Sequence, residues 1–299
     1  NDVDWKSRSF TSSSIINGKL LGKLKNVNYE TKNVSEYKDA PTNEIFGALG
    51  YLAKVNLFKS VKDNSNHFLT PKVLFRYAPD HMRKGKKGSK LNHLNMFNLD
   101  RLNSFDNFES GLSSTIGFDY EIKNTNNDFE LTIGQVINEK ENKNMPTTSS
   151  LDEKLSDLIG YSSLKINEKI DLNYSFALDQ NYKDLNYNEI GSSFDLNPIK
   201  FDLNYLQEKK HIGDQEYIKT KVAIEKNKNG LFSFETKRNL VTSSAEYYNL
   251  SYEYINDCLR AGLVYRREFY NDSELEEENS LMFKITLTPF GNINSPSFN

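Results

Sequence analysis

The stretch Leu112-Ser-Ser-Thr-Ile-Gly-Phe-Asp-Tyr-Glu-Ile122 sets apolar side chains against polar ones in near-strict alternation. Leu112, Ile116 and Phe118 fall on one face of an extended chain, while the residues between them are polar or glycine. A side-chain period of two belongs to a β-strand, so the pattern predicts a strand with one apolar and one polar face.

The same alternation recurs along most of the chain. Further runs occupy residues 170–178, 199–205, 218–224, 248–254, 259–265 and 281–287. Clusters of Asn, Asp, Gly, Lys and Pro separate them, as expected of turns. We predict about fifteen strands of roughly ten residues, the length that a tilted strand needs to cross a bilayer.

Composition fits a membrane protein built from strands rather than helices. The chain is 37% hydrophobic with a mean hydropathy of -0.68. No stretch approaches the roughly twenty apolar residues of a spanning helix. In a transmembrane barrel only alternate residues contact lipid, and the 12% aromatic content suits interfacial girdles. The net charge of -3 gives no basic face for nucleic acid.

Turn lengths give a topology when the last strand, 281–289, is taken to end on the periplasmic side. Outer-membrane barrels have short periplasmic turns and longer outer loops. Counting backwards, the predicted outer connections are 271–278, 239–243, 211–215, 180–186 and 139–156, and the predicted periplasmic turns are 255–257, 227–230, 197–198 and 167–169. The alternation predicts an all-β fold, a transmembrane antiparallel β-barrel.

The first third of the chain has a weaker pattern. Residues 79–109 are predicted to be a large outer loop or a loop folded into the lumen, and strands are expected near 3–10, 18–30, 44–58 and 68–77. An odd strand count cannot close a bacterial barrel, and an open edge would leave backbone groups unpaired in hydrocarbon. We therefore expect residues 1–299 to be the C-terminal part of a larger barrel, with the first strands lying outside this sequence.

Cys258 is the single cysteine and lies at the predicted periplasmic end of a strand. Outer-membrane proteins mature in an oxidising compartment, where a leftover thiol suggests a disulfide partner elsewhere. A free, half-buried thiol that behaves as a small hydrophobic residue is the alternative.

Several segments resemble the lipopolysaccharide-assembly outer-membrane proteins, the LptD or OstA family. They are the 245–267 hairpin containing Tyr252-Glu-Tyr-Ile-Asn-Asp-Cys258, Arg76-Tyr-Ala-Pro79, Leu99-Asp-Arg-Leu-Asn-Ser-Phe-Asp-Asn-Phe-Glu-Ser-Gly-Leu112, Ile133-Gly-Gln-Val136 and Pro289-Phe-Gly291. The resemblance covers most of the chain, in order. In this family, cysteines at the position of Cys258 pair with cysteines near the amino terminus. Many members have two adjacent cysteines there, and Asp257 replaces one of them here.

The resemblance implies a barrel of about twenty-six strands in the outer membrane of a Gram-negative bacterium. It implies an N-terminal periplasmic jellyroll, absent from this sequence, that receives lipopolysaccharide from an LptA-like bridge. Lipopolysaccharide would leave through a lateral opening between the first and last strands into the outer leaflet. The last strand, with Leu281, Phe283, Ile285 and Leu287, would then be a gate strand. An LptE-like lipoprotein plug in the lumen and the barrel-assembly machinery are the other implied partners.

Two charged loops are candidate contacts. The basic cluster Arg83, Lys84, Lys86, Lys87 and Lys90 could contact lipopolysaccharide phosphates, or it could be a solvated loop. The acidic stretch Glu274, Glu276, Glu277 and Glu278 could attract divalent cations, or it too could be a plain charged loop.

Alternative functions are a general diffusion porin or another outer-membrane transport channel. An outer-membrane enzyme is disfavoured, because the four histidines lie in predicted turns or loops and no nucleophile motif accompanies them. No cofactor or metal site is expected, since phosphate-binding glycine loops and paired-cysteine motifs are absent from the sequence.

Overall fold

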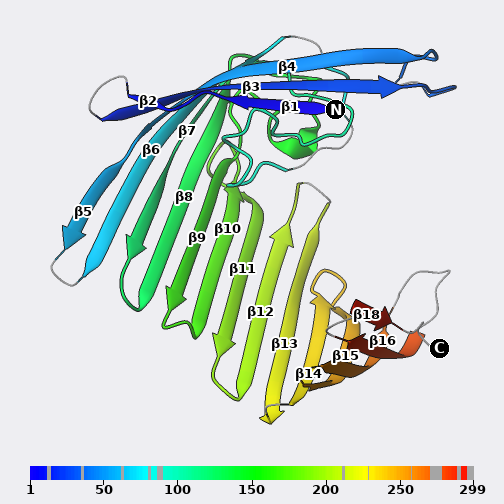
Figure 1. The fold of residues 1–299 in the computed structure, drawn as a ribbon. Coiled ribbons are helices and arrows are strands. Elements are labelled where there is room, and N and C mark those ends of the chain that lie inside the picture. The colour runs from blue at the N-terminus through cyan, green and yellow to red at the C-terminus, as the bar shows by residue number, and fades with distance from the viewer. Residues whose placement is uncertain are drawn as a thin grey trace. The chain divides into compact units, whose positions relative to one another are not determined.

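The computed structural model describes most of the chain, in segments separated by short gaps. The described residues are 1–11, 15–34, 37–61, 64–79, 82–85, 90–210, 213–227, 229–256, 258–269, 278–287 and 291–294. They contain eighteen strands and one short 3-10 turn, η1 (Thr147–Ser149) (Figure 1). No helix in these segments is long and apolar enough to span a membrane.

Five of the eight strands in the first half of the chain have 12 to 14 residues, and the other three have 5 or fewer. The eight are β1 (Asp2–Lys6), β2 (Phe10–Thr11), β3 (Ile16–Tyr29), β4 (Thr42–Val55), β5 (Leu57–Val61), β6 (Ser65–Ala78), β7 (Gly111–Lys123) and β8 (Asn127–Asn138). β1 and β2 both pair with β3, and β4 and β5 both pair with β6. These interrupted strands are one reason why the structure has more strands than the fifteen predicted.

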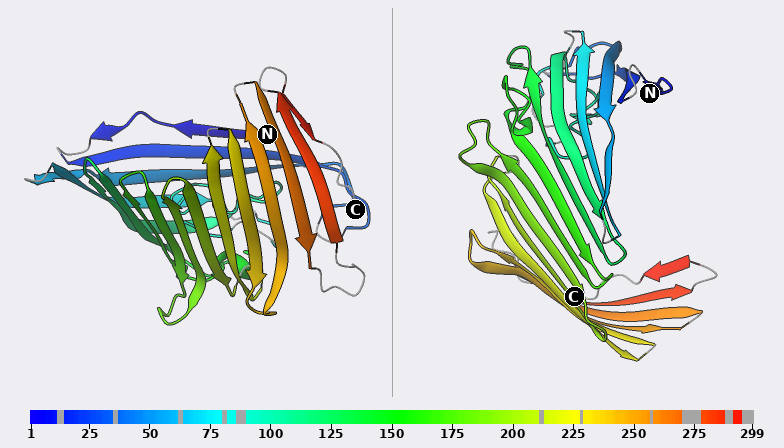
Figure 2. Two further views of the ribbon diagram at one scale, coloured as in Figure 1. Left: turned by 90° about the horizontal axis from the view of Figure 1, so that it is seen from below. Right: turned by 90° about the vertical axis from the view of Figure 1, so that its left-hand side faces the viewer.

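The remaining strands have 4 to 13 residues. They are β9 (Leu158–Ile166), β10 (Ile170–Leu178), β11 (Leu185–Asp195), β12 (Ile199–Glu208), β13 (Gln215–Asn227), β14 (Gly230–Asn239), β15 (Ser244–Ile255), β16 (Leu259–Glu268), β17 (Glu278–Leu287) and β18 (Gly291–Asn294). From β12 to β18 each strand pairs antiparallel with the next (Figure 2). The all-β antiparallel architecture predicted from the sequence is therefore confirmed, whereas barrel closure and a total of about twenty-six strands stay predictions.

The chain divides into two compact units. The first comprises residues 1–163, 175–187 and 209–212, and the second comprises 164–174, 188–208 and 213–299.

Short and long connections alternate along the chain. From β3 onward, the short connections, of three residues or fewer, are 62–64, 124–126, 167–169, 196–198, 228–229, 256–258 and 288–290, and the longer ones are 30–41, 79–110, 139–157, 179–184, 209–214, 240–243 and 269–277. Asn56 interrupts a strand rather than joining a hairpin, because β4 and β5 both pair with β6. Before β3, residues 7–9 separate β1 from β2 and residues 12–15 join β2 to β3. The alternation is the one that the turn lengths predict, and it extends back to β3. It assigns the longer connections to the outer side of a barrel.

Many of the strands expose apolar side chains on one face, and the residues between them point to the opposite face. In β4, Ile45 and Leu49 are 64% and 66% exposed, while their neighbours Glu44, Phe46 and Ala48 are buried. In the second unit the exposed face carries Leu250, Tyr252 and Tyr254 of β15, Leu263 and Tyr265 of β16, and Leu281, Phe283 and Ile285 of β17. A soluble sheet would bury such a face, so its exposure is what a lipid-contacting wall requires.

One expectation about the end of the chain needs correction. The run that begins at residue 281 was expected to be the last strand, but β18 follows it and pairs with residues 284–287 of β17. The connection 288–290 is short enough for an antiparallel return.

Candidate functional site

The polar face of the first unit carries an irregular segment, residues 90–110, here called the inner segment. It contains neither helix nor strand, in agreement with the loop predicted for 79–109. Five of its apolar side chains are almost completely buried, namely Leu91, Met96, Leu99, Leu102 and Phe108, whereas Leu94 and Phe105 are exposed. Leu99 and Phe108 share a core cluster with Val27, Phe46, Ala48 and Ala78, so the segment folds back against β3, β4 and β6. The sequence left open whether this loop lies outside or folds inward. In the structure, residues 90–110 pack on the sheet.

Glycines in the strands make room for the inner segment. A Cβ atom on Gly50 would lie 2.6 Å from Leu99 Cδ2, and one on Gly134 would lie 2.8 Å from Met96 Sδ. Gly117 pairs with Gly134 across β7 and β8, and a Cβ on Gly117 would lie 2.3 Å from the Ile133 carbonyl oxygen. The close approach of these two strands therefore depends on the missing side chain.

We expect Gly117→Ala to destabilise the barrel by about 1–3 kcal/mol, because the added methyl group would meet backbone rather than a movable side chain. Limited proteolysis within residues 90–110 and thermal unfolding in detergent would measure the effect. Gly47→Ala is the matched control on β4, since its Cβ would lie 3.0 Å from the flexible Leu24 side chain and no closer than 3.6 Å to backbone, at the Lys23 carbonyl oxygen. Equal behaviour of the two variants would contradict the prediction.

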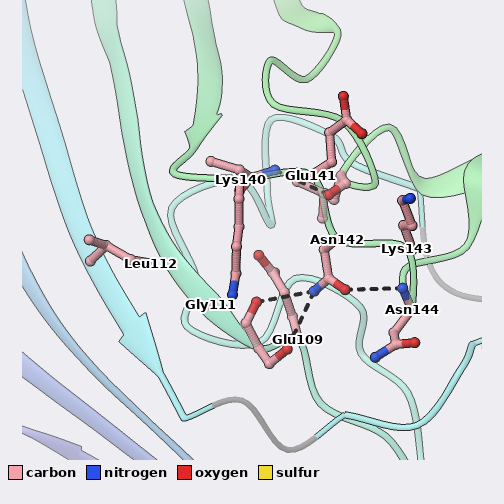
Figure 3. A pocket seen from close by; sticks show the side chains of 11 residues that line it. Glu109, Gly111, Leu112, Lys140, Glu141, Asn142, Lys143 and Asn144 are labelled. Carbon is pink, nitrogen blue, oxygen red and sulfur yellow. Dashed lines mark hydrogen bonds between the residues drawn. The ribbon is translucent and has the colours of Figure 1, made fainter.

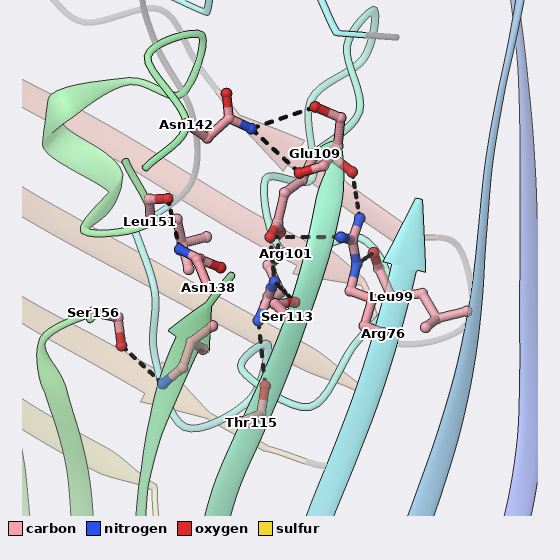
Figure 4. Close-up of polar contacts among 12 residues, drawn as sticks. Arg76, Leu99, Arg101, Glu109, Ser113, Thr115, Asn138, Asn142, Leu151 and Ser156 are labelled. Atoms are coloured by element: carbon pink, nitrogen blue, oxygen red, sulfur yellow. Dashed lines mark hydrogen bonds and ion pairs between the residues drawn. The ribbon is translucent and has the colours of Figure 1, made fainter. Parts of the chain in front are cut away.

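A buried ionic network fixes the inner segment to β6 and β7 (Figure 4). Arg101 donates to both carboxylate oxygens of Glu109, from Nε at 2.8 Å and from Nη2, and it also donates to the hydroxyls of Ser113 and Thr115 at 2.8 and 3.2 Å. Arg76 of β6 donates from Nε to the Leu99 carbonyl at 2.7 Å and from Nη2 to the Glu109 carbonyl. All three ionised side chains are 3% exposed or less.

The network holds two cations and one carboxylate. Burial by itself would raise the pKa of Glu109, but Arg101 and Arg76 outweigh burial and lower that pKa below its usual value. Arg76 Nη1 lies 3.6 Å from Glu109 Oε1 and makes no hydrogen bond. Glu109 is thus the single carboxylate that neutralises both guanidinium groups directly.

A second ion pair anchors the middle of the inner segment. Lys25 Nζ of β3 donates to Asp100 Oδ2 at 2.7 Å and to the Ser104 carbonyl at 2.5 Å. Both ionised side chains are buried, and Lys25 Nζ also lies 5.6 Å from the Phe108 ring centroid. The segment is therefore tied to the sheet at residues 100, 104, 101 and 109.

Arg83, from the predicted basic cluster, is engaged within the chain. Its guanidinium donates to Glu44 of β4 and to the Asp106 carbonyl, and it lies 5.0 and 4.8 Å from the ring centroids of Tyr29 and Tyr37. Burial would raise the pKa of Asp106, but the Tyr37 and Ser104 hydroxyls and Arg83 together lower it. This cage was not foreseen from the sequence.

The structure does not bring the whole predicted basic cluster together. Lys84 is exposed, and Lys90 Nζ lies over the Tyr187 ring. Lys86 and Lys87 lie outside the described residues. Contact between this cluster and lipopolysaccharide phosphates stays a prediction.

Residues 139–157 form a second irregular segment beside the first and enclose a polar cavity of about 250 Å3 (Figure 3). Asn142 Nδ2 donates to the Ser110 carbonyl at 3.2 Å, and Asn138 Nδ2 donates to the Leu151 and Glu153 carbonyls at 3.1 and 2.7 Å. Lys140, Glu141 and Lys143 also line the cavity. Its mixed charges suit a small polar group or water.

The other predicted positions are at strand ends. Cys258 is exposed in the connection between β15 and β16, where its backbone N–H donates to the Asn256 side chain at 3.0 Å. Its place in a short connection agrees with the predicted periplasmic turn, and a disulfide stays a prediction. Leu281, Phe283 and Ile285 of the predicted gate strand are exposed on the apolar face, and Leu287 is partly buried.

Among the described residues, no group of three or more His, Cys, Asp and Glu side chains could hold a metal ion. Glu274, Glu276 and Glu277 lie outside those residues, and only the backbone of Glu278, in β17, is described. The cation-binding hypothesis for that loop therefore stays a prediction.

A family model described as "LptD: LPS transport system D" matches residues 45–252. The matched range includes most of β4, all of β5 to β14 and most of β15, together with the inner segment and its ionic network. The chain belongs to the LptD family. This is a transport and assembly family rather than an enzyme family, and it points to a bacterial outer membrane. The resemblance read from the sequence is confirmed.

The solved structures found to resemble this LptD-family chain are porins, and their sequence identity to it is low. Two mutants of the Rh. blastica porin align with TM-scores of 0.40, at 9% and 10% identity, covering 92% of this chain and 90% of the porin. A triple mutant of the Rhodopseudomonas blastica porin aligns with a TM-score of 0.35 at 10% identity, covering 94% of this chain and 97% of that one. No curated protein matches the sequence.

Arg76, Arg101 and Glu109 lie in segments that resemble the family, but no pattern in the sequence predicts a structural role for them. Two features of the sequence could have pointed to these residues. Residues 99–110 contain charged side chains but no alternation, and the strand before them carries an arginine among apolar residues. A charged residue in such a place needs a partner when it is buried. The partners could be named only after the segment was seen folded against β6.

Proposed function

We propose that this chain is part of an outer-membrane barrel that inserts lipopolysaccharide into the outer leaflet through a lateral opening. The observation that carries the proposal is the LptD family match over residues 45–252. The exposed apolar face supports it, because such a face suits contact with acyl chains.

The polar face would contact the sugar and phosphate part of the substrate. In the second unit it carries a hollow of about 230 Å3 lined by alternating charges and amides, including Asp202, Lys219, Lys221, Glu235 and Asn173. Such a surface can exchange hydrogen bonds with a sugar as readily as with water. In the first unit the anchored inner segment covers part of the polar face, so we propose that it narrows the path beside β3 to β7.

The remaining parts of the proposal concern the gate and the partners. We propose that Leu281, Phe283, Ile285 and Leu287 of β17 belong to the wall that opens, and that Cys258 forms a disulfide with a cysteine outside residues 1–299. An N-terminal periplasmic jellyroll would deliver the substrate from an LptA-like bridge, an LptE-like lipoprotein would occupy the lumen, and the barrel-assembly machinery would insert the barrel. Family membership supports this arrangement.

The proposal is tested by photo-crosslinking in cells that make the full-length protein. A photoreactive residue in place of Lys219 or Ser193, both in the polar hollow, should yield adducts with lipopolysaccharide. Tyr254 is the matched control, because it is exposed on the apolar face next to the short connection 256–258, where the inner leaflet is expected. It should yield phospholipid adducts instead.

Two results would contradict the proposal. One is the absence of lipopolysaccharide adducts at both polar-face positions while Tyr254 crosslinks to lipid. The other is stable, open ion conductance of the reconstituted protein without any lipoprotein partner, which would favour the diffusion porin.

A further inference from the structure

The apolar face of the second unit has a hollow of about 440 Å3 near the longer connections of β13, β14 and β15. It is lined by Ile218, Thr220, Thr236, Arg238, Ala245 and Tyr248. An arginine is unusual on a face that otherwise carries Val222, Phe232 and Phe234. None of these residues belongs to the inner segment or to the predicted gate and basic cluster.

A β-bulge creates the hollow. Lys237 pairs with Tyr247, but the next residue, Arg238, pairs with Ala245, so Glu246 is the extra residue of β15. The small Ala245 side chain therefore lies opposite Arg238, and the small pair Thr220 and Thr236 lies one step further along the same face. The hollow is the space that these small side chains leave beside the long Arg238 side chain. A β-bulge commonly redirects side chains, and here it places Ala245 opposite Arg238.

Aromatic contacts hold one wall of the hollow in place. The Tyr248 ring stacks on Phe234 at 6.0 Å and meets Phe269 edge-on at 5.3 Å between ring centroids. The Arg267 guanidinium lies 4.8 Å from the Phe269 centroid. Two arginines, Arg238 and Arg267, thus flank an aromatic group at the same end of the strands.

The charges around the hollow favour an anion. Arg238 is exposed, and its described hydrogen bond is a long one of 3.4 Å from Nη2 to the Ser243 carbonyl. Glu216, the nearby carboxylate on β13, accepts a hydrogen bond from the Tyr205 hydroxyl at 2.7 Å. Glu246 pairs with Lys237 at 2.7 Å. Both carboxylates therefore have other partners, and the Arg238 fork remains available to a ligand.

We propose that this hollow binds a phosphate-bearing glycolipid of the outer leaflet, with the phosphate on Arg238 and an acyl chain along Ile218 and Tyr248. The planar fork of an arginine fits phosphate oxygens in pairs, and tyrosines are typical of the membrane interface. The inference rests on the proposed function in one respect: the longer connections must lie at the leaflet that contains lipopolysaccharide. It concerns the outside of the wall, whereas transport concerns the polar face.

The test is native mass spectrometry of the full-length protein in detergent, titrated with lipid A that carries two phosphates. Arg238→Gln should weaken lipid A binding about tenfold, the effect of losing one charge-assisted contact. Ala245→Leu should weaken it too, by filling the hollow while keeping the charge. Arg260→Gln is the matched control, because Arg260 is at the opposite end of β16 and is paired with Glu253. It should bind lipid A like the unchanged protein.

Other ligands separate the possible sources of binding. A phosphate-free lipid A analogue and inorganic phosphate alone should each bind at least tenfold more weakly than diphosphoryl lipid A. Equal binding of the phosphate-free analogue, equal binding of phosphatidylglycerol, or unchanged lipid A binding by Arg238→Gln would each overturn the proposal. Photo-crosslinking at Lys219 and Ser193 is independent of this hollow, so failure here would leave the transport proposal standing.

Discussion

Glu109→Gln is expected to release the inner segment from the sheet, with a loss of roughly 3–5 kcal/mol, the usual cost of leaving a buried charge without its partner. The carboxylate is the direct counter-charge of both Arg76 and Arg101, and all three side chains are buried. Glutamine keeps the size and one acceptor oxygen but removes the negative charge. Faster proteolysis within residues 90–110 and a lower unfolding temperature would show the release.

Two comparison variants make this prediction specific. Glu139→Gln, the same chemical change at an exposed residue of the next loop, should have no effect. Arg76→Met should cost less than Glu109→Gln, since it leaves the Arg101 and Glu109 pair electrically neutral. If Glu109→Gln melts like the unchanged protein, the network does not hold the segment.

The same carboxylate gives the network a pH dependence with a definite sign. Because the folded-state pKa of Glu109 is lowered, its contribution to stability is present above the ordinary glutamate pKa and is lost as pH falls through the lowered value. Glu109→Gln should lack this part of the acid transition.

Leu250→Arg is expected to reduce folding into a bilayer by about 2–4 kcal/mol, whereas Ser251→Arg, one residue further along β15, is expected to be tolerated. Leu250 is exposed on the apolar face, near the middle of the strand. Ser251 faces the other way and exchanges a hydrogen bond of 2.6 Å with Ser233. A charge on the lipid side must be placed in hydrocarbon, while a charge on the polar side remains hydrated.

Urea unfolding in lipid vesicles would measure both variants, with gel mobility of the folded and heated forms as a second readout. Ser251→Arg serves as the control, because it adds the same side chain to the same strand. A larger loss for Ser251→Arg than for Leu250→Arg would reverse the assignment of the two faces. Equal losses would indicate that this part of the sheet does not contact lipid.

The strand predictions are confirmed because a side-chain period of two is a local property of the sequence. Residues 112–122 and 248–254 show it without reference to any other part of the chain, and both lie in strands with their apolar side chains on one face. Turn lengths are equally local, so the alternation of connections was predicted correctly. The sequence did not predict that β4 and β5 are separated at Asn56 or that β18 follows β17. A one-residue break and a strand of four residues are too short to show a clear alternation.

The fold of the inner segment could not be predicted from the sequence, for a physical reason. Residues 90–110 have no period, and their fold is fixed by partners far away in the chain: Lys25 for Asp100 and Arg76 for Glu109. Alternation, turn length and family resemblance determined that this chain is an antiparallel β-protein of the LptD family. Only the tertiary structure decided which charges are buried together, because that depends on which distant strands approach the loop.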